Sequence, residues 1–322
     1  MLNSIIHFQI KKLIIISFML LSGTLMACSS GGDNPDPNPN PGPDPTPTKY
    51  IISSGRINTQ NKFSFTYGRM DVSAKLPKTA NGLWPAIWLL GTDQSRGWPS
   101  CGEIDILEMG GKAGIDNGTS ERFVTSGTHW GELLDGGAHP AYARNDNVPV
   151  NLQDDFHLYT FTWDETKIRI FIDPELDSDA NIVNPDNTWF YEILINVYNG
   201  EYPVGEYFHK PFFIILNLAV GGDFPSIYDI DKITALNEAN NFEAKMYIDY
   251  IKIYDGVKAE NIKWQDLFDG NTLDDTKWNI EVNDDGGGNN ELQSYRSQNI
   301  SVGKEPETDK NCLIITAKKQ AE

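Results

Sequence analysis

The chain has 322 residues, of which 39% are hydrophobic and 11% aromatic, so it can bury one large core. Its formal net charge of -19 at pH 7 disfavours nucleic acids and anionic lipid surfaces as partners. A neutral ligand fits this charge better, and eight tryptophans and thirteen tyrosines favour a carbohydrate or an apolar molecule.

Residues 1–28 are predicted to be an export leader, with a pair of lysines before an apolar stretch over residues 13–21. The stretch is too short for a stop-transfer helix. Its end, Leu-Met-Ala-Cys28, resembles the lipobox of bacterial lipoproteins, so we expect a lipidated Cys28 and an outer-membrane, cell-surface location. An ordinary secretory signal is the alternative. Whether the remaining cysteines, Cys101 and Cys312, pair stays open at this point.

Residues 29–48 are predicted to be a proline-rich linker. Every second residue from Pro35 to Pro47 is proline. Such a run stays extended as polyproline II and spans about 40 Å at roughly 3 Å per residue. We expect it to hold a folded domain, residues 49–322, away from a membrane.

The rest of the chain is predicted to form short strands between turns rich in glycine, asparagine, aspartate and proline. Apolar residues alternate over 63–67 and 70–74, and Gly68, where the parity changes, indicates a bulge. No stretch has a convincing helical period. The pattern predicts an all-β, two-sheet antiparallel sandwich in which one sheet curls into a cleft. Further strands are expected over residues 83–90, 159–163, 168–172, 212–220, 246–254 and 313–318.

Three carboxylates stand close together in one of these strands, at Glu103, Asp105 and Glu108. Side chains of a strand alternate between its faces, so Glu103 and Asp105 share a face. Strict alternation would bury Glu108, which is costly. A bulge at residues 106–107 returns Glu108 to the face of the other two. The alternative is an acidic strand face that only contacts solvent.

Residues 97–108 around these carboxylates resemble the signature of glycoside hydrolase family 16 in its laminarinase-type form, E-x-D-x-x-E. The resemblance implies a concanavalin A-like jelly-roll sandwich with a concave substrate cleft. Further resemblances follow the family's order over residues 49–254. They are Gly82-Leu-Trp-Pro-Ala-Ile-Trp-Leu-Leu-Gly91, Gly127-Thr-His-Trp-Gly131, Leu216-Asn-Leu-Ala-Val-Gly-Gly222 and Ile248-Asp-Tyr-Ile-Lys-Ile-Tyr254.

The C-terminal segment departs from the family's order. Stretches within residues 264–317 resemble segments that normally begin the domain, and residues 50–58 resemble what normally follows them. We therefore expect a circular permutation, in which residues 260–322 correspond to the usual N-terminal part. Chain ends that lie close together at the surface make such a rearrangement tolerable.

The resemblance implies glycoside hydrolysis with retention, which needs two carboxyl groups about 5–5.5 Å apart. By matching positions, Glu103 is the nucleophile and Glu108 is the general acid and later the general base. Asp105 is expected to hydrogen-bond Glu103 and to share a proton with it. The reaction requires no cofactor.

Aromatic side chains near the carboxylates are predicted to bind sugar rings. Trp98 and Trp84 are expected to stack on them, with a core position as the alternative for Trp84, whereas Trp88 is expected in the core. The family match implies that His129 and Trp130 lie on the leaving-group side of the cleft. A structural role for His129 is the alternative.

Three polar residues, Arg56, Asn217 and Asn290, match family positions that hydrogen-bond sugar hydroxyls. Many family members also bind a structural calcium ion on the convex face, and Asp249 matches its aspartate ligand. The remaining ligands would be backbone oxygens, so a solvated strand aspartate is the alternative at Asp249.

These inferences predict a monomeric, surface-anchored endo-β-glucanase that cleaves neutral β-1,3-glucan or mixed β-1,3/1,4-glucan with retention. A sulfated galactan would call for a basic cleft, so the acidic chain favours glucan. One alternative is a family 16 hydrolase of another polysaccharide such as a galactan. The other is a non-catalytic glycan-binding lipoprotein, which we expect to lack one of the three carboxylates.

Overall fold

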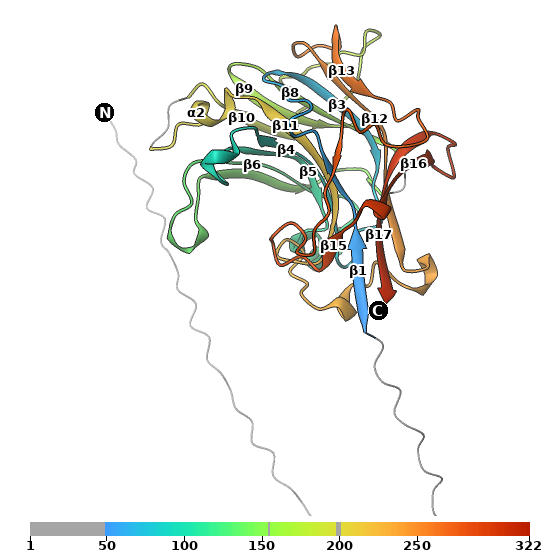
Figure 1. Cartoon of the computed structure of the whole chain (residues 1–322). Helices are drawn as coiled ribbons and strands as arrows, with labels where there is room; N and C mark the ends of the chain where they lie inside the picture. Colours follow the sequence, from blue (N-terminus) through green and yellow to red (C-terminus); the bar gives the residue numbers. More distant parts are fainter. Residues whose placement is uncertain (1–48, 154, 198–200) are drawn as a thin grey trace, which may run out of the picture. The chain divides into compact units, whose positions relative to one another are not determined.

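Two β-sheets stacked face to face make up the folded part of the chain (Figure 1). The computed structural model describes residues 49–153, 155–197 and 201–322. The predicted leader, Cys28 and the linker lie outside the described residues. Within those ranges, no helix is long and apolar enough to span a membrane.

The two sheets are almost entirely antiparallel, and among the described strands only β1 and β15 pair in parallel. The predicted two-sheet antiparallel sandwich is therefore confirmed. The ten-stranded sheet has the order β10 (Tyr191–Leu194), β9 (Lys167–Ile172), β8 (His157–Trp163), β3 (Gly68–Lys75), β12 (Glu243–Tyr254), β17 (Asn311–Ala321), β1 (Tyr50–Ser54), β15 (Gln293–Tyr295), with β13 (Ile262–Asp266) beside β12 and β16 (Ile300–Lys304) beside β17. The seven-stranded sheet has the order β14 (Asn279–Ile280), β2 (Arg56–Asn58), β11 (Phe212–Val220), β4 (Leu83–Gly91), β5 (Glu103–Met109), β6 (Phe123–His129), β7 (Ala141–Asn147).

The helices of the described chain are short and connect strands, as the missing helical period predicts. The two α-helices are α1 (Lys112–Asn117) and α2 (Gly205–Phe208). The 3-10 turns are η1 (Gln94–Arg96), η2 (Asp135–Gly137), η3 (Ile230–Lys232), η4 (Glu238–Asn240) and η5 (Ser297–Asn299).

One predicted strand, residues 63–67, is wrong. Only Phe65 forms a bridge there, with Phe212, and Tyr67 has a left-handed backbone with φ of 59°. The amide of Phe63 donates to the carbonyl of Thr59, which makes a turn at the start of this stretch. Its alternating aromatic residues pack rings into the core instead of pairing along a strand.

The core lies between the sheets and is filled by side chains that alternate along facing strands. On β8, Tyr159, Phe161 and Trp163 are all fully buried. The ring of Trp163 meets Phe65 and Phe212 edge-on, with centroids 6.0 and 5.6 Å away. Each such side chain contributes about 1.5–3 kcal/mol through its burial, so the core holds both sheets together.

Gly55 lets the chain cross from one sheet to the other. The preceding strand β1 pairs with β17 in the ten-stranded sheet, and the following strand β2 pairs with β11 in the seven-stranded sheet. A β-carbon at residue 55 would come within 2.4 Å of Ile300 Cδ1. A glycine therefore fits the crossing without moving Ile300, and the crossing brings Arg56 to the other sheet.

The C-terminal segment supplies strands to both sheets. β17 lies between β12 and β1, where residues 313–318 pair with 243–248 and residues 318–321 pair with 50–53. β14 pairs with β2 in the seven-stranded sheet. Figure 1 shows the last strands, drawn in orange and red, beside the blue first strand. The segment after residue 259 is thus part of the same sandwich.

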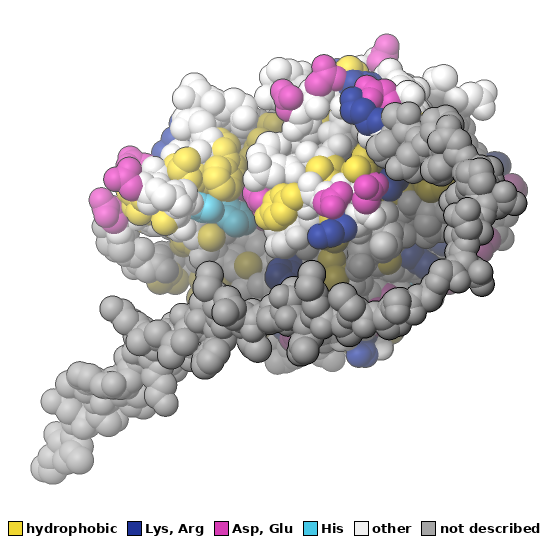
Figure 2. Space-filling model, turned by 90° about the horizontal axis from the view of Figure 1, so that it is seen from below, with side chains coloured by type: hydrophobic (Ala, Val, Ile, Leu, Met, Phe, Trp, Pro, Cys, Tyr) yellow, Lys and Arg dark blue, Asp and Glu magenta, His cyan; other side chains and the backbone are white. Residues whose placement is uncertain are grey.

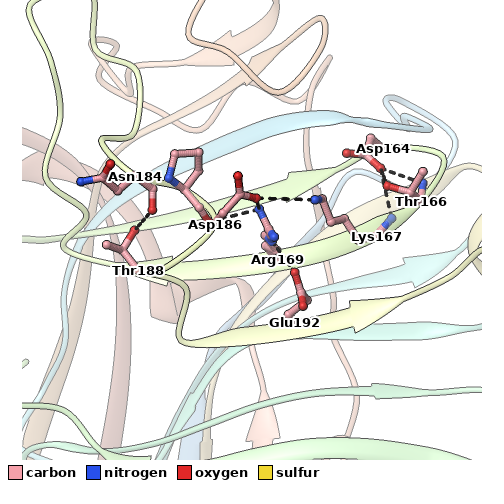
Figure 3. A network of polar contacts seen from close by, with 9 residues as sticks. Asp164, Thr166, Lys167, Arg169, Asn184, Asp186, Thr188 and Glu192 are labelled. Carbon is pink, nitrogen blue, oxygen red and sulfur yellow. Dashed lines mark hydrogen bonds and ion pairs between the residues drawn. The ribbon is translucent and has the colours of Figure 1, made fainter.

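Paired charges cover the outer face of the ten-stranded sheet. Buried Arg69 donates to both oxygens of Asp71 at 2.7 and 2.8 Å. Figure 3 shows Arg169 between Glu192 and Asp186, to which it donates at 2.6 and 2.7 Å. Loss of one partner from a buried pair is strongly destabilising because it leaves an uncompensated charge. Arg169 bonds Glu192 on the neighbouring strand β10 and exposed Asp186, and it thereby connects the loop that contains Asp186 to the sheet.

Removing residues 259–322 should abolish folding. The deletion takes β17 from the middle of the ten-stranded sheet, so β12 and β1 lose their common neighbour and expose unpaired edges. Residues 49–258 should then show no cooperative thermal transition by circular dichroism and no dispersed amide signals by NMR. A soluble, cooperatively folded fragment would instead identify the C-terminal segment as a separate module.

A rearranged chain, with residues 260–322 placed ahead of residues 49–258, is the matched control because it keeps every strand. The amide of Glu322 donates to the carbonyl of Lys49 at 2.9 Å, and their side chains form an ion pair. A short Asn-Gly turn can therefore join these two antiparallel strands. The rearranged chain should melt cooperatively, with the far-UV spectrum of the natural order.

Candidate active site

The strand β5 contains the predicted bulge, and it sets the positions of the three carboxyl groups. Opposite β6, Asp105 pairs with Gly127 and Glu108 pairs with Thr125, so only Ser126 faces the two residues between them. The register with β4 shifts at the same point. The bulge at residues 106–107 is therefore confirmed. It turns Glu108 to the face of Glu103, while the apolar residues between them are buried in the core.

The three carboxyl groups line one cavity of about 470 Å³ on the outer face of the seven-stranded sheet. Its walls come from β2, β4, β5, β11, the turn before β5 and the glycine-rich turn before β15. Figure 2 shows one face of the domain on which histidine side chains lie among hydrophobic ones. The lining residues are Arg56, Trp84, Ala86, Trp88, Leu90, Trp98, Glu103, Asp105, Glu108, Asn217, Gly287, Gly288, Asn289 and Glu291.

Two tryptophans donate hydrogen bonds to different carboxyl groups. The indole N–H of Trp84, on β4, lies 2.9 Å from Oε1 of Glu108. The indole N–H of Trp98, in the turn before β5, lies 3.1 Å from Oε2 of Glu103. Trp84 also stacks on Phe224 with ring centroids 4.8 Å apart, whereas Trp98 is 45% exposed. Both predicted tryptophans thus lie in the cavity, and each holds one carboxyl group.

His129 ends β6 opposite Glu103 and contacts the middle carboxyl group. Its Nε2 lies 3.3 Å from Oδ2 of Asp105, so the contact that the structure gives Asp105 is with His129. The predicted hydrogen bond from Asp105 to Glu103 stays a prediction. The Nδ1 of His129 lies 2.8 Å from Nε2 of His139, a residue that the sequence did not single out.

Burial raises the pKa of all three carboxyl groups. It raises the pKa of Glu108 to about 8 and that of Asp105 to about 7. It also raises the pKa of Glu103 well above its usual range, and the nearby charge of Asp105 adds to this rise. His129 and the Trp98 hydrogen bond lower the pKa of Glu103. Since the three groups cannot all ionise together, the cluster retains protons near neutral pH.

This arrangement can carry out paired acid and nucleophile chemistry. Each of Glu103 and Glu108 accepts an indole N–H that favours its ionised form, and burial raises the pKa of both, so one of them can act as an acid while the other ionises. A cavity lined by indole rings holds a pyranose ring well, because the ring's C–H faces pack on aromatic surfaces. One carboxylate and one carboxylic acid beside such a ring are what glycoside hydrolysis requires.

Arg56, Trp88 and Asn217 form a polar wall at one side of the cavity. The indole N–H of Trp88 donates to Oδ1 of Asn217 at 2.7 Å, and the guanidinium of Arg56 lies 4.9 Å from the Trp88 ring centroid. Arg56 also pairs with Glu281 at 3.1 Å. The expectation that Trp88 lies in the core is wrong, because the alternation that points Trp84 into the cavity also points Trp88 there.

The C-terminal segment reaches the cavity, but not through Asn290. The side-chain amide of Asn290 donates to both oxygens of Asp223, at 3.0 and 3.2 Å, and its left-handed backbone (φ 55°) turns it away. Its neighbours Asn289 and Glu291 line the cavity instead. Glu291 accepts from the amide of Gly287 at 2.8 Å, which holds the glycine-rich turn in place.

Trp130 does not line the cavity. It is 8% exposed, donates its indole N–H to the carbonyl of Tyr202 at 3.1 Å, and packs edge-on against Phe208. Consecutive side chains at the end of a strand point to opposite faces, so His129 and Trp130 cannot both face the cavity. The predicted sugar contact for Trp130 therefore has no support in its position.

Asp249 lies on β12, away from the cavity lining. Its carboxylate accepts from the ammonium group of Lys310 at 2.6 Å and from Ser73 at 3.4 Å. An ammonium group at this distance occupies the place of a metal ion, so these residues as placed do not fit a calcium site. Cys101 and Cys312 are both buried free thiols.

The comparison with known proteins follows this geometry. The chain matches Glycosyl hydrolases family 16 over residues 44–203. A solved family 16 glycoside hydrolase of the Bacteroides ovatus mixed linkage glucan PUL, in complex with a G4G4G3G product, is 36% identical with a TM-score of 0.52. The match covers 65% of this chain and 83% of that one. The chain belongs to glycoside hydrolase family 16.

Two curated relatives of this family 16 protein have glucan in their names. Glucan endo-1,3-beta-glucosidase A1 of Niallia circulans is 32% identical over 63% of this chain. Beta-1,3-glucan-binding protein of Penaeus monodon is 33% identical over 53% of this chain. The matches cover only 26% and 47% of these two relatives, respectively, so much of each lies outside the matched region.

Replacing Trp84 by phenylalanine should raise the pKa of Glu108 further above about 8, by roughly half a unit to one unit. The indole N–H stabilises the ionised form, so its loss favours the protonated form, while a phenyl ring can keep the stack on Phe224. Carboxyl ¹³C chemical shifts followed against pH measure this directly. Trp98→Phe is the matched control and should raise the pKa of Glu103 instead. A Glu108 titration that is unmoved, or moves to lower pH, would contradict the assignment.

Proposed function

We propose that this family 16 protein is a retaining endo-β-glucanase that cleaves neutral β-1,3-glucan or mixed β-1,3/1,4-glucan. The observation that carries the proposal is that one bulged strand brings Glu103, Asp105 and Glu108 into one cavity, where each glutamate accepts an indole N–H. The glucan names of similar proteins support the substrate class.

The proposed reaction is a double displacement. The carboxylate of Glu103 attacks the anomeric carbon while Glu108 gives its proton to the departing glycosidic oxygen. In the second step, the Glu108 carboxylate takes a proton from a water molecule. The oxygen of that water attacks the anomeric carbon and releases Glu103 as a carboxylate. The Trp84 N–H stabilises Glu108 in its ionised form between the two steps.

The cavity supports a neutral polysaccharide. Arg56 is the one basic residue among the described lining residues, and Glu281 pairs with it. The other charged lining residues are carboxyl groups, which would repel the sulfate groups of a sulfated galactan. Indole rings and the amide of Asn217 instead fit a ring that carries only hydroxyl groups.

Glu103→Gln and Glu108→Gln should each lower turnover by roughly a thousandfold or more with the fold intact, because each removes a chemical step. Reducing-sugar release from laminarin and barley β-glucan, with product sizes by chromatography, measures this loss. Azide should rescue Glu103→Ala as an α-glycosyl azide and Glu108→Ala as the β-anomer. Near-normal activity in either Gln variant, or rescue with the opposite anomers, would overturn the assigned roles.

A glycan-binding protein without activity is the second candidate, because one similar protein is named for β-1,3-glucan binding. This candidate would be favoured if laminarin in an affinity gel retards the migration of the purified protein, but the protein releases no reducing sugar from laminarin or barley glucan. Neutral and sulfated galactans belong in the same assay, since a family 16 hydrolase of a galactan is the remaining alternative.

We also infer that the domain is a circular permutation of the family's usual order. Residues 260–322 supply strands to both sheets, and their glycine-rich turn supplies cavity residues. These positions support the interpretation that this segment, which resembles the usual N-terminal part, keeps its place in the fold after moving along the chain.

We further propose that Cys28 carries a lipid anchor that holds the protein at a bacterial cell surface. Cys28→Ala should then move the protein from the membrane fraction to the soluble fraction, since the acyl chains supply the membrane affinity. Fractionation with immunoblotting and metabolic labelling with a fatty acid measure the two parts of this prediction. Ser29→Ala is the matched control and should stay in the membrane fraction. A Cys28→Ala protein that remains there would reveal another tether.

A further inference from the structure

His139 lies behind the catalytic carboxyl groups, in the loop of residues 130–140 between β6 and β7. Its Nε2 lies 2.8 Å from Nδ1 of His129, and its Nδ1 lies 3.2 Å from the carbonyl oxygen of Gly137. Its ring also meets Trp98 edge-on, with centroids 4.6 Å apart. One side chain therefore contacts both His129, which lies beside the Asp105 carboxyl group, and Trp98, which donates to Glu103.

The partners of these two histidines decide where the ring protons lie. A carbonyl oxygen only accepts, so the contact with Gly137 places a proton on Nδ1 of His139. A neutral His139 then has a lone pair on Nε2 and accepts from Nδ1–H of His129. This leaves Nε2 of a neutral His129 without a proton, 3.3 Å from Oδ2 of Asp105. The last contact is a hydrogen bond only if one further proton lies between those two atoms.

We propose that His139 is a positioning residue that fixes the ring protons of His129 and thereby keeps one proton shared between His129 and Asp105. Its role in turnover rests on the proposed function, in which Glu103 attacks as an anion. With the shared proton, Asp105 and His129 together carry no net charge. Without the acceptor on His139, His129 carries its proton on Nε2 and donates to an ionised Asp105, so the pair has a charge of -1.

The charged groups that face this pair come from β5. Glu103 is opposite His129 in the register of β5 and β6, and Glu108 lies on the same face of β5. On the other side of β6, uncharged Ala141 is opposite His129. An ionised Asp105 raises the pKa of both Glu103 and Glu108. Replacing His139 by a residue that cannot accept therefore moves both limbs of the pH–rate profile to higher pH.

The first test reads the ring protons without any activity. In ¹⁵N-labelled full-length protein, two-dimensional NMR should show His129 protonated at Nδ1. His139→Phe removes the acceptor but keeps a ring beside Trp98, and it should shift neutral His129 to the form protonated at Nε2. His139→Gln keeps an acceptor near the position of Nε2 and should preserve the Nδ1 proton. A wild-type His129 protonated only at Nε2 overturns the proposal, whether or not the protein cleaves glucan.

The second test follows kcat and KM against pH on laminarin and barley β-glucan. His139→Phe should lower kcat about tenfold, change KM little, and move both limbs up by roughly half a unit. His139→Gln should restore the limbs. His209→Phe is the matched control, since His209 bonds Tyr67 and not the carboxyl cluster, and its limbs should stay in place. Unmoved limbs in His139→Phe overturn the proposal. If that variant unfolds, the wild-type spectrum and His139→Gln still decide the question.

Discussion

The cost of ionising three neighbouring carboxyl groups in one cavity is the constraint on which the rest of this site depends. The bulge of β5 creates the problem, because it returns Glu108 to the face of Glu103 and Asp105. The surrounding donors reduce this cost. Trp98 favours charge on Glu103, Trp84 favours charge on Glu108, and His129 favours charge on both, while burial raises the pKa of both. Protons therefore remain in the cluster near neutral pH, and the three groups share them.

A chain of hydrogen bonds builds one wall of the cavity from distant parts of the sequence. Trp88 donates to Asn217, whose amide nitrogen lies 3.4 Å from the hydroxyl of Tyr295. That hydroxyl donates to Glu291 at 3.2 Å, and Glu291 also accepts a hydrogen bond from the amide of Gly287. The wall thus joins β4, β11, β15 and the glycine-rich turn, so a shift in any one of them would change the shape of the cavity.

The sequence predicted the parts of the site that strand geometry controls. The period of a strand and the cost of a buried carboxylate together required the bulge that places Glu108. Contacts made by loops were beyond such reasoning. The left-handed backbone of Asn290 turns its own side chain out of the cavity, and Glu291 lines the cavity instead. No pattern in the sequence signals that turn. His139 was missed for the same reason, since its loop has no periodicity that relates it to His129.

The alternation of side chains between the faces of a strand would have corrected the predicted positions of two further residues. Trp88 shares the parity of Trp84 and therefore faces the cavity, although a core position was expected. Trp130 follows His129 directly and must face the other way. In both cases the face of the strand decided the outcome, and residue type did not.

The contact between Lys49 and Glu322 determines at which end of the domain a tether ahead of Lys49 is attached. Both lie where β1 and β17 pair, beside the Glu243 end of β12, whereas the β12–β13 hairpin lies at the far end of the same strand, about 40 Å away at roughly 3.3 Å per residue. In the proposed permutation, that hairpin joins the two segments that hold the chain ends in the family's usual order. A tether ahead of Lys49 therefore attaches at the opposite end of β12 from a tether attached at residue 260.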